Sequence, residues 1–214
     1  MEFNPLFLLV SCQKEQHKWK RLSHIFTKYE HCILCGGLSD SNYLIHKNLL
    51  LLNCNDKYEG LPEKILGALL VISRDEKYKK ISHVIKIDSD NKFQSLSLIL
   101  KKIKSFNSYD YFGARLNKIY GSQKGNTKWH FGKVSEDSFW HENEYKGEYC
   151  DWIDGGCSYC LSRRAIELLT SDFDFSNFKK ISKNHIYEDL MIAILLKKYN
   201  IYPKNVSYGI EGDK

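Results

Sequence analysis

Apolar positions in the first half of the chain form short unbroken runs, and these runs are separated by stretches with helical spacing. The runs predict buried strands at 6–12, 31–37 and 81–87, with one or two more within 43–53. Helical spacing predicts one helix from about Glu15 to Tyr29, and a second that has Pro62 near its first turn and runs to about Ser73. Alternating strands and helices are typical of an α/β sheet with helices on both faces.

The second half is less regular. Apolar residues at 96, 99, 100 and 103 recur at helical spacing, and 109–116 resembles another strand. Residues 151–169 predict a strand and a glycine turn that lead into a helix starting near Ser162, and a last helix opens at Glu188 and Asp189.

The stretch from Asn117 to Glu148 has little periodicity and is rich in Gly, Lys, Glu, Asn and Trp. Loops of this length in compact domains are commonly lids or binding loops. Its aromatic side chains either cover the face of a sugar or fill a small side core, and the sequence favours neither for Trp129, Phe131, Phe139, Trp140 and Tyr145.

Composition supports one folded domain over 1–214. With 43% hydrophobic and 14% aromatic residues the chain can bury a substantial core, and no stretch has the composition of a linker. The net charge of +6 admits nucleic acid, anionic membranes or phosphate-bearing ligands as partners. The lysines, however, lie in short dispersed clusters that resemble solvated helix ends, so we expect no nucleic-acid partner.

The N-terminal apolar run, Leu6 to Val10, is preceded by Glu2 and by no basic residue. It is too short for a signal sequence or a membrane span, and we expect a soluble, cytoplasmic protein. The abundance of Lys, Asn and Ile suits a microbial or large DNA virus origin.

Seven cysteines, an odd number mostly within apolar segments, suit a reducing compartment. Two CxxC pairs, Cys32 with Cys35 and Cys157 with Cys160, raise the question of a zinc site. Both pairs lie in segments predicted as strands, where positions three apart point to opposite faces. Buried free thiols are therefore the favoured interpretation.

The stretch ISHVIKIDSDNKF, 81–93, carries the clearest candidate chemistry. Asp88 and Asp90 follow its apolar residues, where the strand ends, and the carboxyl ends of strands are where α/β proteins place ligands. Two carboxylates separated by one residue can turn toward a hard cation that also binds substrate phosphates. The alternative is an ordinary turn, since Asp, Ser and Asn are common turn residues.

Two other features also have a structural alternative. Gly155 and Gly156 permit either the close approach of a ligand or backbone, or simply a tight turn. Glu188 and Asp189 open a helix that has lysines in its last turn, so they also suit the helix dipole without any active site.

Taken together, these stretches resemble the β-1,3-galactosyltransferase and fringe branch of the GT-A nucleotide-sugar glycosyltransferases (glycosyltransferase family 31). The resemblance runs from about Leu49 to Pro203, with a weaker likeness in the first strand and helix. The matching stretches, in order, are NDKYEGLPEK, IDSD, TKWHF, the 149–162 stretch with GGCSYCLS, and EDLMIAILLKKYNIYP.

The resemblance implies a single GT-A domain with a Rossmann-like mixed sheet, its donor-binding half at about 1–92 and its acceptor-binding half at about 93–214. It implies an inverting transfer of a hexose or N-acetylhexosamine from a UDP-sugar to a sugar hydroxyl, with Mn²⁺ or Mg²⁺. Asp90 is the implied direct metal ligand, with Asp88 beside it, and Asp189 the general base. The expected donor side comprises Ser11, Asp56, Lys64, Asp88, Ser89 and Asp90. The expected acceptor or sugar pocket comprises Trp129, Asp154, Gly155, Gly156 and Glu188.

The chain departs from the family pattern at two points. Ser89 stands where the family typically has the middle Asp of an Asp-Asp-Asp run, and no His follows His185, although relatives often use a late His as a metal ligand. Three alternatives remain open. They are a metal-dependent nucleotidyltransferase, a basic non-catalytic nucleic-acid-binding module, and a family member that binds sugar without transferring it.

Overall fold

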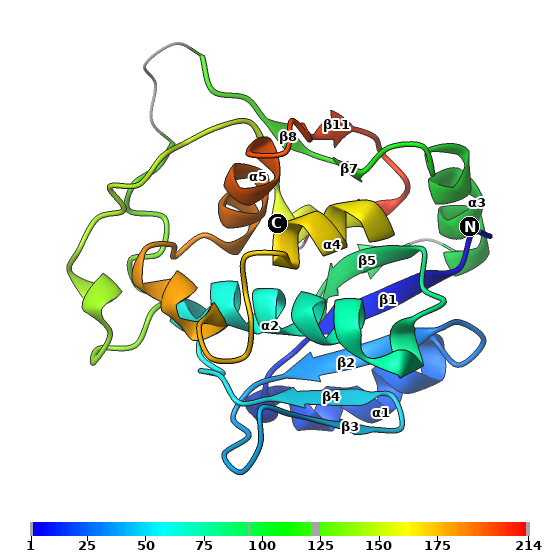
Figure 1. Ribbon diagram of the computed structural model, residues 1–214, viewed down its shortest axis with the longest axis horizontal. Coiled ribbons are helices and arrows are strands. Elements are labelled where there is room, and N and C mark those ends of the chain that lie inside the picture. Colours follow the sequence, from blue (N-terminus) through cyan, green and yellow to red (C-terminus); the bar gives the residue numbers. More distant parts are fainter. Residues whose placement is uncertain (1, 94, 121–124, 213–214) are drawn as a thin grey trace.

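An eight-stranded mixed sheet with helices on both faces organises the computed structural model, which describes residues 2–93, 95–120 and 125–212 (Figure 1). The strand order is β11-β7-β10-β5-β1-β2-β4-β3. The strands are β1 Pro5–Val10, β2 His31–Cys35, β3 Tyr43–His46, β4 Leu49–Leu52, β5 His83–Asp88, β7 Tyr111–Gly113, β10 Tyr159–Ser162 and β11 Lys204–Asn205.

The centre of the sheet is parallel. β1 lies between β2 and β5 and runs parallel to both, and β4 continues the parallel set beside β2. β3 and β10 run antiparallel to their neighbours β4 and β5. The mixed α/β architecture expected from the sequence is therefore confirmed.

The buried run of β1 explains its central place. Its side chains alternate between two cores, with Leu6, Leu8 and Val10 facing one and Phe7 and Leu9 facing the other. A strand that is apolar on both faces is stable only where helices cover both faces of the sheet.

In the described part of the chain, three helices cover the first face and two cover the second (Figure 1). On the first face lie α2 Leu61–Arg74, α4 Arg163–Thr170 and α5 Glu188–Lys197. On the second lie α1 Gln16–Ile25 and α3 Leu96–Ser105. Helix α3 shows the predicted period, because Leu96, Ile99 and Ile103 are its buried positions.

Short elements complete the fold. β6 Lys92–Phe93 pairs with β12 Ile210–Glu211, and β8 Leu116–Asn117 pairs with β9 Trp152–Ile153. Six 3₁₀ turns join the larger elements of the described chain, at Gln13–Glu15, Tyr58–Gly60, Glu76–Tyr78, Phe139–His141, Gly155–Cys157 and Phe178–Lys183.

Several predicted boundaries are wrong. The first helix ends at Ile25 rather than near Tyr29, because Phe26 leaves the helical conformation to pack in the core. The strand expected over 109–116 is split between β7 and β8. Cys157 lies in a 3₁₀ turn rather than in a strand, and the seven cysteines are free thiols.

Residues 126–145 form an irregular flap with its own small core. Trp140 and Tyr145 are buried there against Tyr187 and Leu190 at the start of α5. Trp129 and Phe139, by contrast, are 59% and 66% exposed. The aromatic residues of this segment therefore divide between a side core and the surface. Within the described chain, no helix is long and apolar enough to cross a membrane.

Candidate active site

The turn after β5 is fixed by Asn91. Its side-chain oxygen accepts a hydrogen bond from the backbone of Asp88 at 2.8 Å, and its amide donates to the Gly156 carbonyl at 2.7 Å. Ser89 adds a backbone bond to Val10 at the end of β1, at 3.1 Å. The turn after β5 is thereby held between β1 and the glycine turn at Gly155–Cys157. Asp90 is exposed on the turn after β5.

Lys86 is the central charge of this region. It lies two residues before Asp88 and so on the same face of β5, its side chain is 1% exposed, and its ammonium is 2.7 Å from a carboxylate oxygen of Asp88. It also donates to the Gly155 carbonyl at 2.9 Å. Burial raises the pKa of Asp88, and the nearby Lys86 opposes that rise.

The glycine turn lies against the start of α5. Asp189 accepts the backbone N–H of Gly155 at 2.9 Å, and Asp154 accepts that of Gly156 at 3.0 Å. A Cβ on Gly155 would lie only 2.9 Å from a carboxylate oxygen of Glu188 and 3.1 Å from Cβ of Asp189. Glycine is thus required at 155 because two side chains of α5 approach this backbone closely.

Adjacent carboxylates at the start of α5 have different environments. Glu188 is 4% exposed and accepts the hydroxyl of Tyr159, and burial raises its pKa to about 7. Asp189 is half-buried, and burial raises its pKa as well. One oxygen of Asp189 accepts the N–H of Leu190 in its own helix and the other binds across to Gly155, so it does more than cap the helix.

The raised pKa of Glu188 predicts that the stability of the protein depends on pH. The folded protein holds a proton on Glu188 up to about pH 7, whereas the unfolded chain releases it near its ordinary pKa of 4.5. The folded state binds more protons in this window, so its stability falls as pH rises through it. Glu188→Gln keeps an acceptor for Tyr159 and removes the titration. We expect the melting temperature of the wild type, relative to that of the variant, to drop between about pH 5 and pH 7.5. Parallel pH profiles for the two proteins would contradict the raised pKa.

Asp56 and Lys64 form a buried ion pair at the carboxyl ends of β1 and β2, with a separation of 2.7 Å. Asp56 also accepts the backbone N–H groups of Gln13 and Gly36, and Lys64 donates to the Ser11 carbonyl at 3.0 Å. These contacts hold together the loops beside the Asp88 turn. A donor-binding role for Ser11, Asp56 and Lys64 stays a prediction.

Sequence reasoning missed Glu15. Its carboxylate accepts hydrogen bonds from Ser89 at 2.5 Å and from Ser11 at 3.3 Å, and it pairs with Lys18. The pKa of Glu15 is lowered, because hydrogen bonds from Lys18 and Ser89 outweigh the effect of burial. A serine at 89 is therefore suited to this site, whereas a carboxylate there would face Glu15.

The remaining predicted residues lie at the edge of the site. Asp154 pairs with Arg115 at 3.0 Å and bounds the glycine turn. Trp129 is on the flap, with the ammonium of Lys133 3.6 Å from its ring centroid. Its backbone N–H donates to the hydroxyl of Tyr187, the residue before Glu188.

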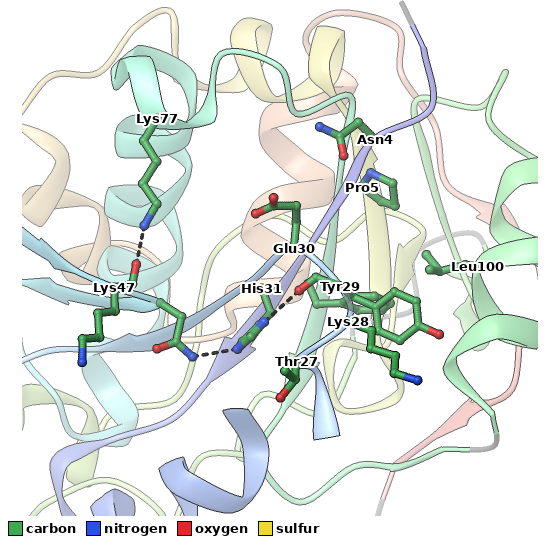
Figure 2. A pocket seen from close by; sticks show the side chains of 12 residues that line it. Asn4, Pro5, Thr27, Lys28, Tyr29, Glu30, His31, Lys47, Lys77 and Leu100 are labelled. Atoms are coloured by element: carbon green, nitrogen blue, oxygen red, sulfur yellow. Dashed lines mark hydrogen bonds between the residues drawn. The ribbon is translucent and has the colours of Figure 1, made fainter. Parts of the chain in front are cut away.

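A cavity of about 520 Å³ lies at the opposite end of the sheet, beside the amino ends of β1 and β2. Figure 2 shows that Lys28, Lys47 and Lys77 at its rim do not converge, and that the Lys77 ammonium is bound to the Lys47 carbonyl. This arrangement does not form an anion site.

Comparison with known proteins decides the family. A model of the galactosyltransferase family matches residues 38–207. The chain belongs to the galactosyltransferase family. The resemblance inferred from the sequence is confirmed, and membership supports a glycosyltransferase activity with a sugar donor and a sugar acceptor. Asp88, Asp90 and Asp189 of this galactosyltransferase-family chain lie within the matched range, whereas Ser11 and Glu15 precede it.

Two solved structures resemble the galactosyltransferase-family chain over 99% of its length. One is A197 from STIV, with 11% identity, 86% of that chain covered and a TM-score of 0.49. The other is 4-diphosphocytidyl-2C-methyl-D-erythritol synthase from Anaerococcus prevotii, with 10% identity, 90% covered and a TM-score of 0.45. A search of curated proteins finds no match. The family assignment rests on the family model.

Proposed function

We propose that this chain transfers a hexose or N-acetylhexosamine from a UDP-sugar to an acceptor hydroxyl with inversion at the anomeric carbon. One observation carries the proposal. A continuous series of polar contacts joins Asp88 through Lys86 and Gly155 to Asp189, which supports a single site formed by the carboxylates of the turn after β5 and of α5.

Asp88 and Asp90 suit a divalent cation. The described residues contain no group of three or more His, Cys, Asp or Glu side chains that would form a complete protein cage. Mg²⁺ and Mn²⁺ do not need one, because Mg²⁺ is commonly held by one or two carboxylates together with substrate phosphates and water, and oxygen ligands suit Mn²⁺ equally. When bound, such an ion would act as a Lewis acid that neutralises charge on the leaving diphosphate.

Asp189 is the proposed general base. It is more exposed than Glu188, and its two backbone hydrogen bonds fix the carboxylate while leaving lone pairs free to accept a proton. Glu188 is enclosed and occupied by Tyr159, so it has no path to an acceptor hydroxyl. A base without an enzyme nucleophile produces inversion, by the geometry that separates the two classes of glycosidase.

Lys86 has a supporting role. Its positive charge explains how the carboxylates of Asp88, Glu188 and Asp189 can lie close together. Its ammonium pairs with Asp88, and the charges of Glu188 and Asp189 also act on it. Burial alone would lower the pKa of Lys86, but these carboxylates outweigh burial and keep the residue protonated. Lys86 thus opposes the rise that burial causes in the pKa of Asp88, and it adds to the larger effect of the Gly155 and Leu190 N–H groups on the pKa of Asp189.

The proposal is tested by melting the protein with UDP-, GDP-, CMP- and dTDP-sugars, with and without Mn²⁺. A ligand that binds only the folded state at 100 times its Kd stabilises it by about 2.7 kcal/mol. We expect a clear rise in melting temperature with UDP-sugars and Mn²⁺ together. Stabilisation by nucleoside triphosphates instead would indicate a nucleotidyltransferase.

Asp90→Asn is the matched variant for this experiment. It removes one ligand charge from an exposed position, so the fold should be unaffected while the Mn²⁺-dependent part of the UDP shift is lost. Asp40→Asn, at an exposed carboxylate on the loop between β2 and β3, is the control and should keep the full shift. An undiminished shift in Asp90→Asn would exclude Asp90 as a metal ligand.

A further inference from the structure

A second cavity, of about 550 Å³, shares a wall with the candidate active site. The wall is the segment 55–60. Its Tyr58 packs against the small core that contains Tyr187 and Leu190 at the start of α5, and its Asn55, Glu59 and Gly60 line the cavity. The opposite wall comes from the flap and from the 3₁₀ turn before α5. Side chains with binding chemistry around it are Glu59, Glu63, Phe139, Lys179, Ser182 and Lys183.

The charges around this cavity balance. Glu59 and Glu63 contribute two carboxylates, and Lys179 and Lys183 contribute two ammonium groups. Such a lining does not favour a phosphate or another strongly charged ligand, because each charge of the ligand meets one of its own sign. It favours a neutral ligand that offers both donors and acceptors.

An aromatic surface lies at the same place. Phe139 is 66% exposed, and its ring rests edge-to-face on Trp140 with centroids 5.2 Å apart. Trp140 is buried and anchored by a 2.9 Å hydrogen bond from its indole to the Ser182 carbonyl. The exposed ring thus lies on a buried, hydrogen-bonded tryptophan beside the polar groups of the cavity.

One polar group of the cavity lacks a partner. The hydroxyl oxygen of Ser182 is buried beside Glu63 and makes no hydrogen bond of ordinary geometry with the described residues, although it is close enough to oppose the rise in the pKa of Glu63. Buried hydroxyls rarely lack a full hydrogen bond, and Ser182 is one of the residues that line this cavity. Glu63 is also buried here, and accepts the N–H of Asn55 at 2.5 Å.

We propose that this cavity is a carbohydrate subsite that holds a neutral sugar unit of the acceptor glycan, away from the hydroxyl that receives the transferred sugar. A sugar ring has an apolar C–H face that suits Phe139 and a rim of hydroxyls that suits Ser182, Glu63 and the lysines. The proposal rests on the proposed glycosyltransferase function. The shared wall at 55–60 places the two sites on neighbouring parts of one acceptor.

The direct test measures glycan binding without any donor. Galacto-oligosaccharides of one to five β-linked units are titrated into the full chain and followed by ligand-observed NMR. We expect the longer chains to bind more tightly than the monosaccharide. Phe139→Ala should weaken their binding roughly five- to thirty-fold, as expected for loss of one aromatic contact. Tyr202→Ala removes a similarly exposed aromatic side chain (56%) outside the cavity and should have no effect.

Ser182→Ala separates a binding role from a structural one. Removing an unpaired hydroxyl should leave the melting temperature unchanged or slightly higher, whereas affinity for the longer glycans should fall. In transfer assays both cavity variants should raise KM for long acceptors and leave kcat and the monosaccharide KM unchanged. This split would not arise from general destabilisation.

Absence of glycan binding by the wild type, or equal binding by Phe139→Ala and Tyr202→Ala, overturns the subsite. Neither result affects the UDP-sugar experiment, which measures donor binding at the candidate active site on the other side of the 55–60 segment. Conversely, loss of glycan binding in Phe139→Ala together with no UDP effect on melting would retain the carbohydrate site and reject the UDP-sugar donor of the proposed function.

Discussion

Asp189→Asn is expected to lower kcat for sugar transfer by about 10²–10⁴-fold, the range typical for removal of a general base. Asparagine has nearly the same shape and keeps one oxygen that can accept a backbone N–H from Gly155 or Leu190. It cannot accept a proton from the acceptor hydroxyl. Since Asp189 is not among the proposed metal ligands, affinity for UDP with Mn²⁺ should change little.

Initial rates and calorimetric UDP affinity, measured on the same preparations, check this expectation. Glu188→Gln is the matched control, because it neutralises the adjacent carboxylate, which is enclosed and bound to Tyr159. Its kcat should fall much less. If kcat falls more in Glu188→Gln than in Asp189→Asn, Glu188 is the general base instead of Asp189. If Asp189→Asn and Asp90→Asn lose equal affinity for UDP, the general base and the metal ligand are not separate residues.

The main features of the fold were predictable because they depend on local pattern. The unbroken apolar run of β1 could only be a strand covered on both faces, and Ser162 was correctly placed at the start of α4, where its hydroxyl accepts the N–H of Ala165. The turn at Asp88 was predictable for the same reason. What failed were element ends, where core packing of single residues such as Phe26 decides the boundary.

The site was only half predictable. The sequence pattern pointed directly to Asp88, Asp90 and Asp189. The contacts that connect Asp88 to Asp189 run through Lys86, and Lys86 was overlooked because the 81–87 strand was predicted from its apolar residues. A lysine within a buried strand was nevertheless a signal, because lysine is almost never fully buried without a partner of opposite charge. Its position two residues before Asp88 already places both on one face of the strand.

Other contacts had no local signal. Glu15 meets Ser89 across 74 positions of sequence, and Asp189 meets Gly155 across 34. Such pairs become neighbours only when β1, β5 and α5 are assembled around one edge of the sheet. Of the two interpretations of the glycine pair, the structure has the tight turn, at Gly155–Cys157, but the close approach of the Glu188 and Asp189 side chains to Gly155 had no local signal.

Lys86→Met is expected to have the largest effect on stability. It leaves carboxylates of Asp88 and Glu188 without their buried counter-charge, and removal of one partner from a buried pair costs about 3–5 kcal/mol. The loss should depend on pH. Burial already raises the pKa of both carboxylates, and without Lys86 they bind protons still more readily when folded than when unfolded. Stability of the variant therefore falls as pH rises, so its deficit is larger at about pH 8 than at about pH 5.5.

Urea unfolding of wild type and variant at these two pH values measures the deficit. Lys64→Met is the matched control, because Lys64 is equally buried and also pairs with an aspartate. Its partner Asp56 has a lowered pKa, since hydrogen bonds from Lys64 and from the backbone of Gln13 outweigh burial, and the backbone bonds remain in the variant. The Lys64→Met deficit should thus vary little between the two pH values. If the deficit of Lys86→Met is just as constant, Lys86 is not the counter-charge that keeps the carboxylates of this site ionised.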